Sequence, residues 1–242
     1  MDWWQDTWAQ VTTPNPEPSA LLVGGTALLV VVVLAFPTTW RAARHALTIV
    51  HEAGHAAVAV LVGRRVSGIK VHSDTSGLTL SRGKPRGPGM VATAFAGYPA
   101  PALVGLGAAW LLGSGYDVAV LWALLVVAVL VLAAIRNWYG LWAVLVSLAV
   151  LVAVTGWGSA AVQSAFAYAV TWLFLLGAPR AVVELQAERR HTRRAGRRDS
   201  SDAGLLAGLT HVAGAVWVVV FALVTLAAAV WGGAWLVGLR WG

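Results

Sequence analysis

Long apolar runs follow one another along almost the whole chain, and they constrain its fold more than any other feature. Most of them approach the roughly 20 residues that a helix needs to cross the hydrocarbon core of a bilayer. Only 11% of the 242 residues are charged, which is too few to cover a water-soluble domain of this size. The 59% of hydrophobic residues also excludes a disordered chain. The sequence therefore predicts an all-α polytopic membrane protein.

Seven of these runs are candidates for membrane helices, and Pro37 ends the first of them. The last is long enough to be tilted, or broken near Gly232 and Gly233. The runs comprise residues 19–36, 45–62, 88–112, 118–134, 140–155, 159–177 and 205–239, the last of which begins at Leu205 or at His211.

Two polar segments interrupt these runs. In residues 64–86, short apolar stretches alternate with polar residues on both sides of Asp74–Gly77, which predicts a β-hairpin. The basic segment that contains ERRHTRRAGRRDSSD is predicted to be a solvated loop. The chain is thus expected to comprise an extracytoplasmic N-terminal segment (1–18), a membrane domain with the hairpin (19–178), a basic cytoplasmic loop (179–202) and a C-terminal transmembrane helix (203–242).

The basic residues predict the topology, because Lys and Arg near membrane helices stay in the cytoplasm. If all seven runs crossed the bilayer, the two richest basic clusters would lie outside. If the run at 45–62 and the following hairpin instead return to the side they entered from, every cluster lies inside. About six transmembrane helices plus one re-entrant element are therefore predicted, in an integral multi-pass protein of a bacterial plasma membrane. The clusters are Arg41 with Arg44, residues 64–86, Arg136, and residues 180–198.

Composition also limits which reactive groups and binding partners the chain can have. The chain has no Cys, which excludes disulfides, thiolate metal sites and cysteine nucleophiles. Its net charge of +7 is expected to face anionic lipid headgroups rather than nucleic acid. The lipid bilayer is thus a predicted partner, and nucleic acid is not.

The second run contains the sequence HEAGH at residues 51–55. On a helix, His51 and His55 share one face and can bind a single Zn²⁺. Glu52 lies beside the first ligand, where a carboxylate can take a proton from a metal-bound water. Ionisable residues in a membrane run are costly and are normally functional. A buried, hydrogen-bonded pair of His residues, with Glu52 paired to an Arg, is the alternative.

HEAGH in a membrane helix, followed by a hairpin and a helix of small residues, resembles the site-2 protease family of intramembrane zinc metallopeptidases. The resemblance is greatest to the compact branch without a PDZ domain. Its hairpin motif is matched by Gly63–Val71 and Gly77–Thr79, and its later SDAxxLAxxT motif by Ser201–Thr210, before Trp217. The similarity covers most of residues 45–220. It implies a metalloendopeptidase with Zn²⁺ that performs regulated intramembrane proteolysis of membrane-anchored proteins.

A catalytic zinc needs a third protein ligand. The better-known site-2 proteases use an Asp from an LDG-type motif, which this sequence lacks. Asp202 is favoured here, because it matches the SDA motif and begins the last helix at the depth of His51; a helix N-cap is its alternative role. Asn137 and Glu184 are further candidates, although an interfacial turn and a salt bridge to nearby Arg residues explain them equally well.

The hairpin is predicted to bind substrate, because an exposed strand edge can pair with an unwound polypeptide. The residues expected to do so are Val66, Gly68, Ile69, Val71, Gly77 and Leu78. A non-proteolytic scaffold or zinc-handling transporter that keeps the His pair is the competing function. Glu52 distinguishes the two, because a transporter or scaffold does not need the base. A regulatory membrane partner, if there is one, is not identified by the sequence.

Overall fold

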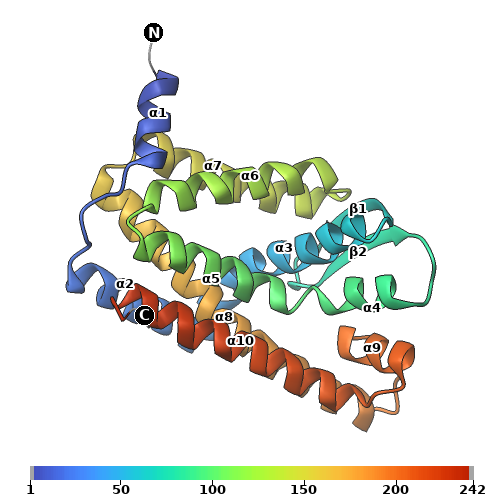
Figure 1. Ribbon diagram of the computed structural model, residues 1–242. Coiled ribbons are helices and arrows are strands. Elements are labelled where there is room, and N and C mark those ends of the chain that lie inside the picture. Colours follow the sequence, from blue (N-terminus) through green and yellow to red (C-terminus); the bar gives the residue numbers. More distant parts are fainter. Residues whose placement is uncertain (1–2, 240–242) are drawn as a thin grey trace.

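Helices form nearly all the regular structure of residues 3–239, which the computed structural model describes, and the prediction of an all-α polytopic membrane protein is confirmed (Figure 1). Prolines occupy the first turn of three of them, where the missing N–H has no helical partner to lose. The helices are α1 (Trp3–Thr12), α2 (Ala20–Ala35), α3 (Pro37–Leu61), α4 (Pro88–Phe95), α5 (Pro99–Gly113), α6 (Asp117–Ala134), α7 (Trp138–Trp157), α8 (Ala160–Arg194), α9 (Asp202–Thr210) and α10 (Gly214–Leu236).

Among the described residues, α6, α7, α8 and α10 are each long and apolar enough to cross a membrane. Two bent pairs also meet these criteria when each is taken as one unit. The pair α2 and α3 bends by 108° where Pro37 follows Phe36, and α4 and α5 bend by 64°. This bend at Phe36 and Pro37 precedes the run at 45–62, which the charge pattern predicts to be re-entrant together with the hairpin.

Two helical boundaries differ from the predictions. The basic segment 179–202 was expected to be a loop, but α8 continues through Pro179 as far as Arg194. Pro179 removes one backbone donor, but the buried residues Val182, Leu185 and Arg189 follow it at helical spacing, which packs the continued helix against the rest of the protein. The last run breaks at His211, whose φ of 59° ends α9, and α10 then runs unbroken through Gly232 and Gly233.

The predicted hairpin is present as an antiparallel pair, β1 (Arg65–Val71) and β2 (Gly77–Arg82). The outer edge of β1 is covered by the turn between α6 and α7. The Arg136 amide donates to the Ile69 carbonyl (2.8 Å), and the Asn137 side chain bonds both the amide and the carbonyl of Val71 (3.1 and 2.7 Å). Among the described residues, no strand pairs with the outer edge of β2.

The bundle core depends on small residues where α5, α8 and α10 meet. A Cβ added at Gly232 of α10 would lie 2.8 Å from both methyl groups of Leu175 and 3.3 Å from the Ala109 side chain. Gly105 of α5 approaches α8 as closely, since its added Cβ would lie 3.1 Å from the backbone nitrogen of Leu175. Membrane helices lack a hydrophobic driving force for association, so this close packing is what joins them.

We predict that Gly232→Val destabilises the protein by about 1–3 kcal/mol, because the new side chain forces α10 away from α8. The measurement is thermal unfolding in detergent micelles. Gly107→Val is the matched control, since nothing lies within 4 Å of its added Cβ and the change in helix propensity from Gly to Val is the same. Equal melting temperatures for the two variants would contradict the packing role.

Candidate metal centre

The α3 helix brings the two imidazoles of the HEAGH motif together. His51 and His55 are one turn apart, and their Nε2 atoms are separated by 3.1 Å. The Nδ1 atom of His55 lies 2.7 Å from the carbonyl oxygen of Thr93, in the last turn of α4, where carbonyls lose helical partners. When Nδ1 carries the proton and donates to this carbonyl, the Nε2 lone pair faces the other imidazole, as a metal ligand requires.

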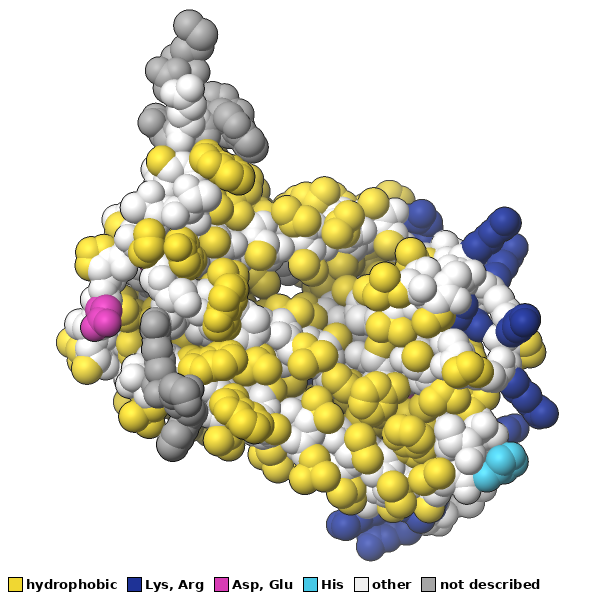
Figure 2. Space-filling view, viewed as in Figure 1, with side chains coloured by type: hydrophobic (Ala, Val, Ile, Leu, Met, Phe, Trp, Pro, Cys, Tyr) yellow, Lys and Arg dark blue, Asp and Glu magenta, His cyan; other side chains and the backbone are white. Residues whose placement is uncertain are grey.

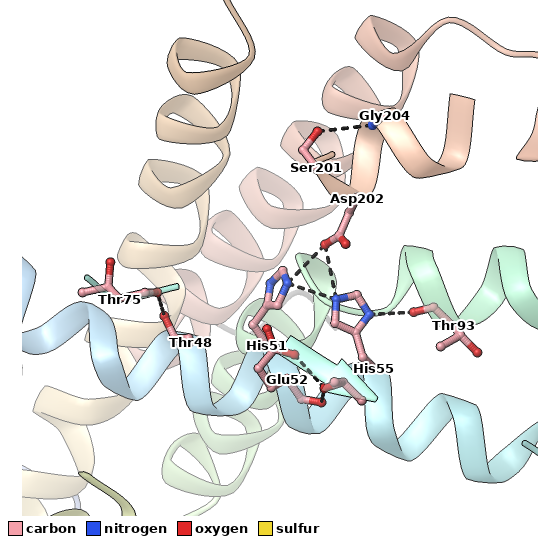
Figure 3. A network of polar contacts seen from close by, with 10 residues as sticks. Thr48, His51, Glu52, His55, Thr75, Thr93, Ser201, Asp202 and Gly204 are labelled. Carbon is pink, nitrogen blue, oxygen red and sulfur yellow. Dashed lines mark hydrogen bonds and ion pairs between the residues drawn. The ribbon is translucent and has the colours of Figure 1, made fainter. Parts of the chain in front are cut away.

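Asp202, the first residue of α9, completes a cluster of three potential ligands (Figure 3). Its Oδ2 atom lies 3.1 Å from Nε2 of His51 and 3.3 Å from Nε2 of His55. The helix is capped by Ser201, whose Oγ accepts from the Gly204 amide at 3.2 Å. The Asp202 carboxylate therefore does not serve as the N-cap, and it faces the histidines instead.

The space beside the imidazoles fits a metal ion. One ligand atom from each of the three residues lies within 4.8 Å of the others, and two imidazoles with one carboxylate are a common ligand set of catalytic zinc. Gly97, in the turn between α4 and α5, keeps this space open. A Cβ there would lie 2.4 Å from Nε2 of His55 and 2.5 Å from Nε2 of His51.

Glu52 is buried on the side of α3 that faces the hairpin. The Thr79 hydroxyl of β2 donates to its Oε2 atom at 2.6 Å. Gly77 lies so close that an added Cβ would meet Oε1 at 2.3 Å. The Thr48 hydroxyl also donates to the Thr75 carbonyl at 2.9 Å, which attaches the hairpin turn to α3.

The three potential metal ligands and Glu52 line the same cavity, which has a volume of about 400 Å³. The His pair and Asp202 lie on one side, and β2 with Glu52 lies on the other. Gly77 and Leu78 of the predicted substrate-binding residues line it, together with Thr79. The β1 residues of that prediction, Val66, Gly68, Ile69 and Val71, do not line the cavity, because β1 lies on the far side of β2 and pairs with the turn between α6 and α7.

The loop before Asp202 is held by an ion pair between Arg189 and Asp199, with Nε 2.7 Å from Oδ2. Arg189 is only 5% exposed and also donates to the Gly214 carbonyl at the start of α10. Burial acts to raise the pKa of Asp199, but hydrogen bonds from Ser201 and the Arg189 guanidinium together hold it below its ordinary value. One arginine thus joins α8, the loop and α10 around the third potential ligand.

The other candidate ligands lie elsewhere. Asn137 bonds the backbone of Val71, and Glu184 pairs with Arg44 at 3.3 Å. Neither belongs to the cluster that could hold a metal among the described residues.

Sequence reasoning assigned no role to Thr93, Gly97 or Arg189, and it included Thr79 only as part of the hairpin motif. Thr93 and Gly97 carry no local signal, because their partners are distant in sequence. Arg189 is one of several arginines that precede Asp199, and no local pattern marks it as the partner of that carboxylate.

A family model described as Peptidase M50B-like matches residues 25–232. This match includes most of α2, all of α3 to α9, the hairpin, the His pair and Asp202. No curated protein and no solved structure matches the chain.

We predict that Gly97→Val abolishes stoichiometric zinc binding without unfolding the bundle, because its side chain would fill the space between the imidazoles. Zinc per protein is measured by elemental analysis, and folding by circular dichroism. Gly208→Val serves as the control, since nothing lies within 4 Å of its added Cβ. Undiminished zinc in Gly97→Val would show that the metal binds elsewhere.

We also predict that Arg189→Met weakens zinc binding by about 10- to 100-fold, because Asp202 is no longer held toward the histidines. The dissociation constant is measured by competition with a chelator. Arg190→Met, which changes an exposed arginine next to it, should leave the affinity unchanged. A loss of the same size in both variants would assign the effect to net charge rather than to position.

Proposed function

Because the chain belongs to the Peptidase M50B-like family, and is therefore an intramembrane metallopeptidase of the site-2 protease type, we propose that it is a zinc endopeptidase that cuts membrane-anchored proteins. In this proposal His51, His55 and Asp202 hold the zinc, and Glu52 is the catalytic base. The observation that carries it is the convergence of the three ligand atoms within 4.8 Å, beside a cavity that also contains Glu52.

Zinc in such a site acts as a Lewis acid that polarises a carbonyl and makes water acidic enough to be deprotonated near neutral pH. Glu52 takes up the proton of the attacking water. Thr79 donates to its Oε2 atom, which fixes the carboxylate and leaves Oε1 as the free acceptor. The same carboxyl group then delivers the proton to the nitrogen of the departing amine, which completes hydrolysis.

The β2 strand is suited to hold the substrate. A helical substrate hides its peptide groups in its own hydrogen bonds, so it must unwind before it is cut. The free edge of β2 can supply replacement hydrogen bonds to the unwound segment. Leu78 and Leu80 are 47% and 39% exposed, as expected for side chains that contact an apolar polypeptide. Val66, Gly68, Ile69 and Val71 would then support β2 from behind.

The charges support an orientation with the basic segments in the cytoplasm. Figure 2 shows Lys and Arg over the hairpin end of the molecule and along its lower edge, whereas the middle of this face is hydrophobic. Anionic lipid headgroups attract such residues. We infer that the His pair lies within the membrane near its cytoplasmic surface, since His51 follows Arg44 by about 10 Å along α3.

We predict that Glu52→Gln lowers the rate of cleavage by at least about 100-fold while zinc binding persists, because the amide cannot accept the proton of water. The assay reconstitutes the protein in vesicles with a panel of single-span proteins and follows their cleavage by mass spectrometry. Asp202→Asn should instead lose zinc, whereas Asn137→Ala and Glu184→Gln should retain it. Cleavage retained by Glu52→Gln would contradict the mechanism. Zinc binding without any cleavage by the wild type would favour a scaffold or transporter.

A further inference from the structure

A second cavity, of about 500 Å³, adjoins the one that contains the metal ligands. The two share Arg44 and Thr75 as lining residues, so they lie on either side of the hairpin turn. Three arginines line the second cavity, Arg41 and Arg44 from α3 and Arg180 from α8, and we call it the arginine cavity. Trp40, Asp74 and Glu184 line it beside them.

Contacts within the arginine cavity hold two of its guanidinium groups in place, those of Arg44 and Arg180. Glu184 pairs with Arg44 at 3.3 Å and with Arg180 at 3.4 Å, and it accepts from the indole N–H of Trp40 at 2.5 Å. The guanidinium carbon of Arg180 lies 4.7 Å from the centre of the Trp40 ring. Each guanidinium has five N–H donors and uses few of them in these contacts. The remaining donors are available to an anion.

The charges do not cancel in this cavity. Arg41, Arg44 and Arg180 supply three positive charges, and Asp74 and Glu184 supply two negative ones. Arg41 is exposed and forms no ion pair with any described carboxylate. The cavity therefore has an excess of one positive charge beside the fixed donors of Arg44 and Arg180, which favours a carboxylate ligand.

The position of the cavity indicates where that carboxylate comes from. The β2 strand passes Glu52 at Gly77, and its N-terminal end leads through Thr75 to Asp74 in the arginine cavity. A substrate paired with the free edge of β2 would therefore extend into this cavity. Antiparallel pairing is the more stable arrangement, and it sends the C-terminal side of the cut bond in this direction.

We propose that the arginine cavity binds an acidic side chain of the substrate, three to five residues C-terminal to the bond that is cut. This rests on the proposed function. Arg44 and Arg41 precede His51 by seven and ten residues, or about 10 and 15 Å along α3. An extended polypeptide covers these distances in about three to five residues.

The test uses any single-span protein that the wild type cleaves, remade with Asp or Asn at each of the six positions on both sides of the cut. Asp at the third to fifth C-terminal positions should lower KM by about fivefold relative to Asn, with kcat little changed. This preference should disappear in Arg41→Gln/Arg180→Gln and persist in the control Arg190→Gln/Arg193→Gln, which removes two exposed charges farther along α8. No preference, a preference on the N-terminal side, or one that survives loss of Arg41 and Arg180 would overturn the proposal.

A binding measurement separates this proposal from the proposed catalysis. The Glu52→Gln protein is titrated with a labelled single-span peptide that carries Asp-Glu-Asp or Asn-Gln-Asn next to the cytoplasmic end of its span. The acidic peptide should bind about fivefold more tightly, and only while Arg41 and Arg180 are present. Equal affinities would reject the subsite whether or not cleavage is ever observed. An effect of the arginines that depends only on anionic lipid in the vesicles would assign the cavity to a lipid headgroup and likewise overturn the proposal.

Discussion

The close approach of α3 to the turn between α4 and α5 is the contact on which the site depends. Gly54, in the middle of the HEAGH motif, makes it possible, since an added Cβ would lie 2.4 Å from the Ala100 side chain and 3.0 Å from the Ala96 carbonyl. The same approach brings Thr93 to His55 and places Gly97 over both imidazoles. Any larger residue at position 54 would push the helices apart and remove the contacts of Thr93 and Gly97 with the two histidines.

Threonine hydroxyls divide into two groups that show how the bundle handles polar atoms. Those of Thr171 and Thr225 bond carbonyls one turn earlier in their own helix, which satisfies a hydroxyl inside an apolar core. Those of Thr48 and Thr79 instead cross between α3 and the hairpin. A bond between elements fixes their relative position, so these two threonines hold the hairpin against the helix that carries the His pair.

The sequence predicts local features well and distant contacts poorly. The prediction that the two histidines of HEAGH share one helix face required only helical periodicity. The family resemblance drawn from this motif is confirmed. Asp202 was one of three candidates, because its distance from His51 depends on the ion pair of Arg189 with Asp199, which no local pattern encodes. The role of Asn137 could not be predicted either. Its side-chain amide hydrogen-bonds the backbone of Val71 as a neighbouring strand would, which covers the edge of β1 and leaves that of β2 free.

The unbroken length of α8 has a consequence for the height of the third potential ligand in the membrane. Its 35 residues span about 52 Å, against about 30 Å for the hydrocarbon core. Arg189 lies near the end of this helix, whose earlier part packs among the other membrane helices. The ion pair of Arg189 with Asp199 attaches the loop before Asp202 to α8, so α8 determines the depth of Asp202 in the membrane.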